Sequence, residues 1–139
     1  MPTSRDGFRD EMGAARAAMT RGDHAAAFAR LERAHILGQL SFPDHVVAHI
    51  WMLRVAWARR DGRELRGQVL RLAATVPGHL FGWLPIGNTG GADVSPLKPM
   101  AIPADLEPYF RDFSLKRQIL RQGLILGVAA ALVGVWVAA

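Results

Sequence analysis

The 139-residue sequence contains no cysteine, which excludes disulfide bonds and thiolate metal sites. Charged residues begin at Arg5 with no apolar stretch around them, so the N-terminus does not predict a secretory signal. No serine stands in a recognisable nucleophile setting, and hydrolase chemistry therefore has no support. These absences leave no positive evidence for an enzyme.

Half of the residues are apolar and 21% are charged, which excludes disorder throughout and fits one small folded domain. The net charge is +5, and six arginines lie between Arg54 and Arg71. Such a cluster is typical of the solvated face of a helix pair. Contact with lipid or nucleic acid through it is a weaker alternative, and nucleic acid is not an expected partner.

The first 76 residues predict four helices. Phe8, Met12, Ala15 and Met19 recur at helical spacing over residues 4–20, and further helices are expected over 24–37, about 43–60 and 63–76. Gly22-Asp23 and Asp61-Gly62 form two similar turns, so the pattern is that of paired helical hairpins, similar to tetratricopeptide repeats. Two hairpins are few for an open array, and we expect a closed bundle. The predicted fold is all-α.

Residues 77–108 hold six of the eight prolines and five of the fourteen glycines, and predict an ordered strap packed on the bundle 1–76. Its run Gly87, Asn88, Thr89, Gly90 and Gly91 resembles a phosphate-binding loop, but it lacks the lysine and hydroxyl of a P-loop. Tight turns with positive φ explain these glycines well enough.

Residues 122–139 contain no charge and follow a basic segment, 109–121, that ends with Lys116, Arg117 and Arg121. These 18 uncharged and mostly apolar residues predict one C-terminal membrane span, and the basic collar predicts a cytoplasmic N-terminal domain. The expected location is thus the bacterial inner membrane, with a tail anchor. Gly123, Gly127 and Ala131 have the small-residue spacing of a helix contact in lipid, with another membrane protein or a second copy of this chain.

Metal-binding residue types cluster between positions 31 and 49. Glu32 and His35 stand three apart, and His45 and His49 stand four apart, so each pair shares one helix face. Glu64 is a further carboxylate on the next predicted helix. A site of Glu32, His35, His45 and His49 would suit a divalent transition metal such as zinc, iron or copper. The alternative is structural, with Glu32 paired to an arginine and His35 bonded to a backbone carbonyl.

Several of these segments together resemble a known bacterial family. They are Leu31 to Gln39, His45 and His49 with Met52-Leu53, Glu64 with Gly67-Gln68, and Gly87 through Met100. The sequence resembles the family called domain of unknown function 3703 over about Phe8 to Leu106. The resemblance implies a small helical protein in which His35, His49 and the glycine loop belong to one design. It implies no activity.

Two functions follow from the sequence. The favoured one is a membrane-anchored helical interaction module, an adaptor or accessory subunit of a bacterial inner-membrane complex. The second is a metal-binding protein that uses the histidines and Glu32.

Overall fold

The computed structural model describes residues 3–111 and, beyond them, residues 120, 123–124, 127 and 131. Its α-helices are α1 (Ser4–Thr20), α2 (His24–Gly38), α3 (Phe42–Ala58) and α4 (Gly62–Phe81), followed by a short 3-10 helix, η1 (Glu107–Phe110). No strand occurs among the described residues. The prediction of an all-α chain with four helices is confirmed.

Local polar side chains fix where these helices begin. Thr3 and Asp6 form a reciprocal capping box at the start of α1. The side chain of Asp23 accepts from the backbone N–H of Ala26, and that of Asp61 accepts from Glu64, so α2 and α4 are capped alike. The two hairpins thus repeat at the turn, as the sequence predicts.

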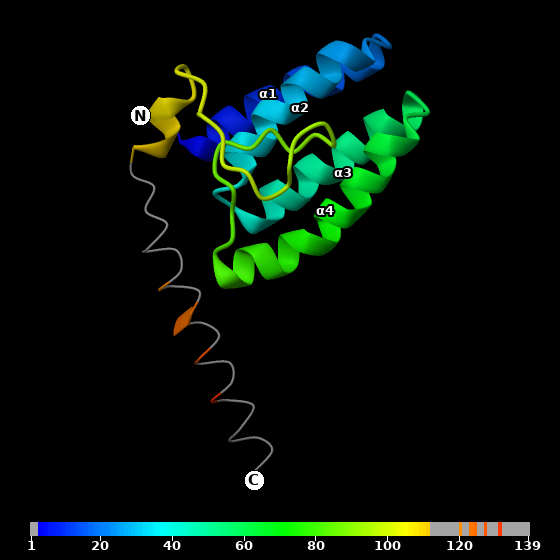
Figure 1. Ribbon diagram of the computed structural model, residues 1–139. Helices are drawn as coiled ribbons and strands as arrows, with labels where there is room; N and C mark the ends of the chain where they lie inside the picture. Colours follow the sequence, from blue (N-terminus) through cyan, green and yellow to red (C-terminus); the bar gives the residue numbers. More distant parts are fainter. Residues whose placement is uncertain (1–2, 112–119, 121–122, 125–126, 128–130, 132–139) are drawn as a thin grey trace.

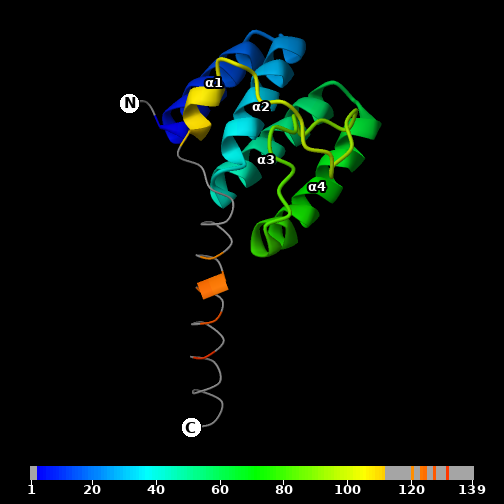
Figure 2. The same cartoon turned by 60° about the vertical axis from the view of Figure 1, so that its left-hand side comes forward.

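The helices pack in chain order, α1 on α2, α2 on α3 and α3 on α4, and α4 makes no comparable interface with α1 or α2 (Figures 1 and 2). The expectation of a closed bundle was therefore wrong, and the arrangement is open. The apolar core lies between α1, α2 and α3 and is centred on Leu31, Leu37 and Met52. All four buried residues of α4 are polar, so α4 does not bury an apolar stripe against α1.

Residues 82–106 return from α4 across the open side of the array to η1, which packs beside α1 (Figures 1 and 2). From here on, the strap means residues 82–106, which lie within the segment 77–108 that the sequence marks as a strap. The predicted end of the fourth helix at Val76 was wrong, because α4 continues through Pro77 to Phe81 and ends at Gly82, whose φ is +71°. Proline removes a single helical donor, and a helix can continue past it.

The predicted membrane span over 122–139 lies almost wholly outside the described residues. Within the part of the chain that the structure describes, no helix combines the length and the apolarity that a bilayer crossing requires. Span, orientation and the contact role of Gly123, Gly127 and Ala131 remain predictions.

Candidate metal centre

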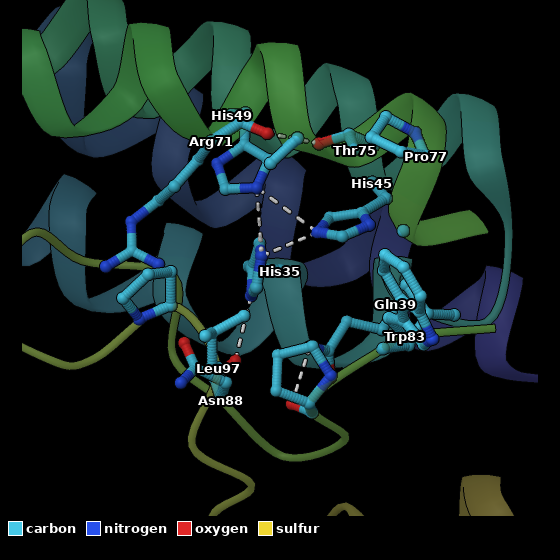
Figure 3. Close-up of a pocket in the computed structure, with 15 residues that line it drawn as sticks. His35, Gln39, His45, His49, Arg71, Thr75, Pro77, Trp83, Asn88 and Leu97 are labelled. Atoms are coloured by element: carbon cyan, nitrogen blue, oxygen red, sulfur yellow. Dashed lines mark hydrogen bonds between the residues drawn. The ribbon is translucent and has the colours of Figure 1, made fainter. Parts of the chain in front are cut away.

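Three buried histidines from two helices meet at one point. His35 lies in the last turn of α2, and His45 and His49 lie one turn apart on α3. Their Nε2 atoms form a small triangle (Figure 3), with 2.8 Å between His45 and His35 and 3.2 Å from His49 to each of the others. The structure thus brings together three of the four side chains that the sequence proposed as one site.

A glycine permits this convergence. A Cβ on Gly38, at the end of α2, would lie 3.2 Å from backbone atoms of Asp44 and His45. Because a side chain would push the start of α3 away, glycine lets His45 approach His35 closely.

The site favours neutral imidazoles. His35, His45 and His49 are each at most 5% exposed. Burial holds the pKa of His35 and of His45 well below the ordinary histidine value, and it lowers the pKa of His49 to about 4. Protons therefore do not compete for the ring nitrogens at neutral pH, and neutral imidazole is the form that binds metal.

Outer hydrogen bonds fix which nitrogen of two rings carries the proton. The Nδ1 of His35 lies 2.9 Å from the carbonyl oxygen of Asn88, which only accepts, so Nδ1 is the donor. The Nδ1 of His49 lies 2.7 Å from Oε1 of Gln68. The amide nitrogen of Gln68 donates to Glu64 and to the carbonyl of Gly90, which leaves Oε1 facing His49 as an acceptor.

It follows that His35 and His49 direct unprotonated Nε2 lone pairs at each other across 3.2 Å. Only the third ring, His45, is free to place a proton between them, because its Nδ1 has no hydrogen-bond partner. Two lone pairs at this distance repel unless a cation or the Nε2–H of His45 lies between them. The arrangement is that of metal ligands whose second nitrogens are held by acceptors.

The strap and α4 supply these acceptors. Gly90 has φ +84°, and a Cβ there would lie 2.7 Å from the ring of His35, so only glycine fits. Asn88 is fixed by its own side chain, which donates to the carbonyls of Ser95 and Lys98. Glu64 accepts from Gln68 and from the backbone N–H of Ala92, linking α4 to the strap.

His79 is a further histidine beside the centre. Its ring centroid lies 5.0 Å from that of His45, and its Nδ1 donates to the carbonyl of Thr75. Its Nε2 is therefore an acceptor, and it is buried without a partner, as is Nδ1 of His45. The two orphaned atoms are complementary, since a metal on Nε2 of His45 would leave Nδ1 as a donor.

A cavity of about 360 Å³ adjoins all three rings. Its remaining walls come from α4 and the strap (Figure 3) and are mostly apolar. The three histidines are thus reached from one side by a space large enough for a small molecule.

The predicted carboxylates lie apart from the histidines. The group of side chains that can converge on a metal, among the described residues, consists of His35, His45 and His49 without Glu32 or Glu64. Glu32 lines a separate polar pocket with Glu64 and Asp93, where burial first and these two carboxylates next raise its pKa to about 6. Glu64 acts on the centre only through Gln68.

Sequence reasoning missed Gln68 and His79 as members of the site. Both lie on the buried side of α4, where every buried side chain is polar. The spacing of Glu64, Gln68, Thr75 and His79, at steps of four, seven and four, is the signal that could have found them.

Comparison with known proteins agrees with the resemblance seen in the sequence. The model of the family described as "Protein of unknown function (DUF3703)" matches residues 3–110, and the chain belongs to this family. No curated protein and no solved structure matches.

Proposed function

We propose that this member of the DUF3703 family is a metal-binding protein that holds one divalent transition metal ion between the Nε2 atoms of His35, His45 and His49. The observation that carries the proposal is the buried triangle of Nε2 atoms, 2.8 to 3.2 Å on a side, in which two lone pairs face each other.

The size of the triangle fits this use. Zinc–nitrogen bonds of about 2.0–2.1 Å in a tetrahedral site separate the nitrogens by roughly 3.3 Å. The observed sides are a few tenths of an ångström shorter, so a small outward shift of the rings admits the ion.

The set of donor atoms narrows the choice of metal ion. Three imidazole nitrogens suit zinc, iron or copper and disfavour magnesium and calcium, which prefer oxygen. Three protein ligands leave at least one coordination position, and the cavity beside the rings offers room for it. A structural zinc site has four protein ligands, so a metal here would be open to a water or a small molecule.

Elemental analysis of the untagged full-length chain, purified without chelator, tests the proposal. We expect about one equivalent of zinc, iron or copper, and less than a tenth of that in the double variant His35→Ala/His49→Ala. His24→Ala is the matched control, because His24 lies outside the triangle at the start of α2, and it should retain the metal. A folded wild-type chain that neither carries metal nor takes up added Zn²⁺ would refute it.

A second candidate is the interaction module expected from the sequence, a tetratricopeptide-like domain anchored by residues 122–139 at the cytoplasmic face of the bacterial inner membrane. Its support is the set of large apolar side chains that the second hairpin exposes, among them Trp57, Val69, Leu70 and Phe81.

Membrane fractionation of the full-length chain, followed by mild cross-linking, tests the second candidate. We expect the chain in the membrane fraction, with a cross-linked partner that is lost in the double variant Trp57→Gln/Leu70→Gln. A chain found only in the aqueous fraction would remove the anchor from this candidate.

A further inference from the structure

The residues that line the cavity beside the three histidines indicate which kind of ligand it can bind. The lining contains apolar residues from α4 and the strap, and seven polar residues: His35, His45, His49, Gln39, Arg71, Thr75 and Asn88. The question is which of these polar groups remain free to bind a ligand.

Three of the seven have their side chains engaged elsewhere. The amide of Asn88 donates to two carbonyls and accepts from the N–H of Gly90. The hydroxyl of Thr75 donates to the carbonyl of Arg71. The amide of Gln39 donates one N–H to the carbonyl of Pro85 and accepts from the backbone N–H of Gly87. Asn88 and Thr75 therefore have no donor left for a ligand, and Gln39 keeps one amide N–H.

Arg71 is different. Its Nη2 donates to the carbonyls of Gly91 and Val94, at 2.7 and 2.6 Å. Within the described residues the guanidinium makes no ion pair, and Nε and Nη1 have no hydrogen-bond partner. The carboxylates of Glu64 and Asp93 line another pocket and act on Arg71 only through space, where they partly oppose the lowering of its pKa by burial. The cavity therefore contains one cation whose charge is not neutralised by a direct partner.

A metal on the three imidazoles would add to this charge. The ligands are neutral, so a divalent ion would keep both its charges, and no carboxylate lines the cavity. Two positive centres in a mostly apolar, partly buried space attract an anion, and an oxyanion can both coordinate a metal and accept from a guanidinium.

The rest of the ligand must be apolar. Trp83, Leu84 and Leu97 line the cavity together with three prolines. Trp83 is 70% exposed and Leu97 is 79% exposed, so both leave apolar surface to be covered at the cavity mouth. Apart from the second amide N–H of Gln39, no free hydrogen-bonding side chain is offered beside these residues, and a polar ligand body would lose most of its water without compensation.

We propose that the cavity binds a small monocarboxylate with a hydrocarbon body, its carboxylate placed at the metal and Arg71 and its chain against Trp83, Leu84 and Leu97. This inference rests on the proposed metal centre and names the class of ligand for the open coordination position.

The test uses the full-length chain loaded with Co²⁺, whose visible absorption reports changes in coordination. Acetate, butyrate, hexanoate and octanoate are titrated as probes, with 1-octanol as the uncharged control. We expect each carboxylate to change the cobalt spectrum, with affinity rising up to about fourfold for each added methylene that is buried. Octanol should leave the cobalt bands unchanged.

Leu97→Ser is the informative variant, because Leu97 is exposed in the free protein and its loss spares the core. It should reduce octanoate affinity at least threefold and leave acetate affinity unaltered. Leu70→Ser is the matched control, since Leu70 lies on α4, is similarly exposed and does not line the cavity. It should change neither the octanoate affinity nor the acetate affinity.

The outcomes separate the inference from the metal centre. Cobalt bands that do not respond to any carboxylate overturn the inference and leave the metal centre standing. Equal affinity for acetate and octanoate overturns the apolar part of it. A chain that takes up no cobalt overturns the metal centre, and the inference falls with it.

Discussion

The α1–α2 hairpin and the last helix of the α3–α4 hairpin bury different kinds of side chain. In the α1–α2 hairpin the interior is apolar and rich in alanine, with Ala15, Ala27, Leu31 and Ala34 fully buried. In the α3–α4 hairpin, α4 buries no apolar residue at all, and its buried side chains are Glu64, Gln68, Thr75 and His79.

This difference separates stability from function within one small domain. Apolar burial in the first hairpin stabilises the fold, whereas buried polar groups in the second cost desolvation and gain little net stability even when hydrogen-bonded. A helix that turns polar residues inward and leaves Val69 and Leu70 more than half exposed is poorly explained by folding alone. The histidine centre and its acceptors account for the inward face of α4.

The largest expected effect comes from a substitution in the apolar core of the first hairpin. Leu31→Ala removes a fully buried side chain from the core and should lower the free energy of unfolding by about 3 kcal/mol. The loss should be equal with and without saturating Zn²⁺, because Leu31 belongs to the apolar core and has no atom that can bind a metal. Urea unfolding of the full-length chain measures both values.

Leu70→Ala is the control for this change, since Leu70 is 71% exposed and its loss should cost at most about 0.5 kcal/mol. A loss below 1 kcal/mol for Leu31→Ala would contradict the assignment of stability to the first hairpin.

A smaller effect tests the second hairpin through His79. If its Nε2 accepts from Nδ1 of His45, directly or through one water, then His79→Ala should weaken Zn²⁺ binding about tenfold, the lower end of the effect of an outer-shell partner. His79→Gln supplies an amide oxygen as acceptor and should recover part of the loss. Competition with a chromophoric chelator measures the affinity.

A purely structural role for His79 makes a different prediction. His79→Ala would then lower the unfolding free energy, and the affinity of the folded chain for Zn²⁺ would stay at the wild-type value.

Much of the fold could be predicted from the sequence because its signals are local. Helix boundaries followed from caps such as Asp23 and Asp61, which act on residues three positions away. The i, i+4 spacing of His45 and His49 likewise placed both on one face of α3. The open packing could not be predicted, because it depends on which face of α4 is buried, and the buried face carries polar residues and no leucine.

The candidate site was predictable only in part for a similar reason. His35 meets Asn88 from 53 positions away, and His49 meets Gln68 from 19 positions away. Such contacts depend on the path of the strap, which no local pattern specifies. Glu32 shares a helix face with His35, yet its side chain lines the neighbouring pocket with Asp93.

Glu32 lies where the first hairpin meets the strap, and the effect of its charge on stability extends the comparison of the two hairpins. Its pKa is raised to about 6 from an ordinary 4.5, so the folded state holds its proton more tightly than the unfolded chain. The protonated form therefore stabilises the fold below about pH 4.5, and this contribution is lost as pH rises through 6. Because Glu32 is only partly buried, we expect about 1 kcal/mol.

Glu32→Gln should therefore be more stable than wild type by about 1 kcal/mol at pH 8 and equally stable at pH 4. Thermal unfolding at the two pH values measures this, with Asp10→Asn as an exposed-carboxylate control. A variant less stable than wild type at pH 8 would show that ionised Glu32 has a favourable partner, such as a bound metal ion.

The smallest effect concerns the turns that close the two hairpins. Both have the hydrogen bonds of a Schellman motif: Gly22 and Asp23 donate to Met19 and Ala18 in the first, and Arg60 and Asp61 donate to Trp57 and Ala56 in the second. The left-handed position is glycine in the first turn, with φ +74°, and arginine in the second, with φ +56°.

A residue with a Cβ destabilises the folded turn by about 1–2 kcal/mol in this conformation. Glycine removes this destabilisation, but it also makes the unfolded chain more flexible, which cancels part of the gain. Arg60→Gly should thus raise the unfolding free energy by about 0.5–1 kcal/mol, and Gly22→Ala should lower it by about 1 kcal/mol, both measured by urea unfolding. Arg60→Ala removes the charge and retains the Cβ, so it should bring no gain. An equal gain for alanine and glycine would assign the effect to the crowded arginines of the second hairpin, and the two turns would then differ in charge and not in backbone strain.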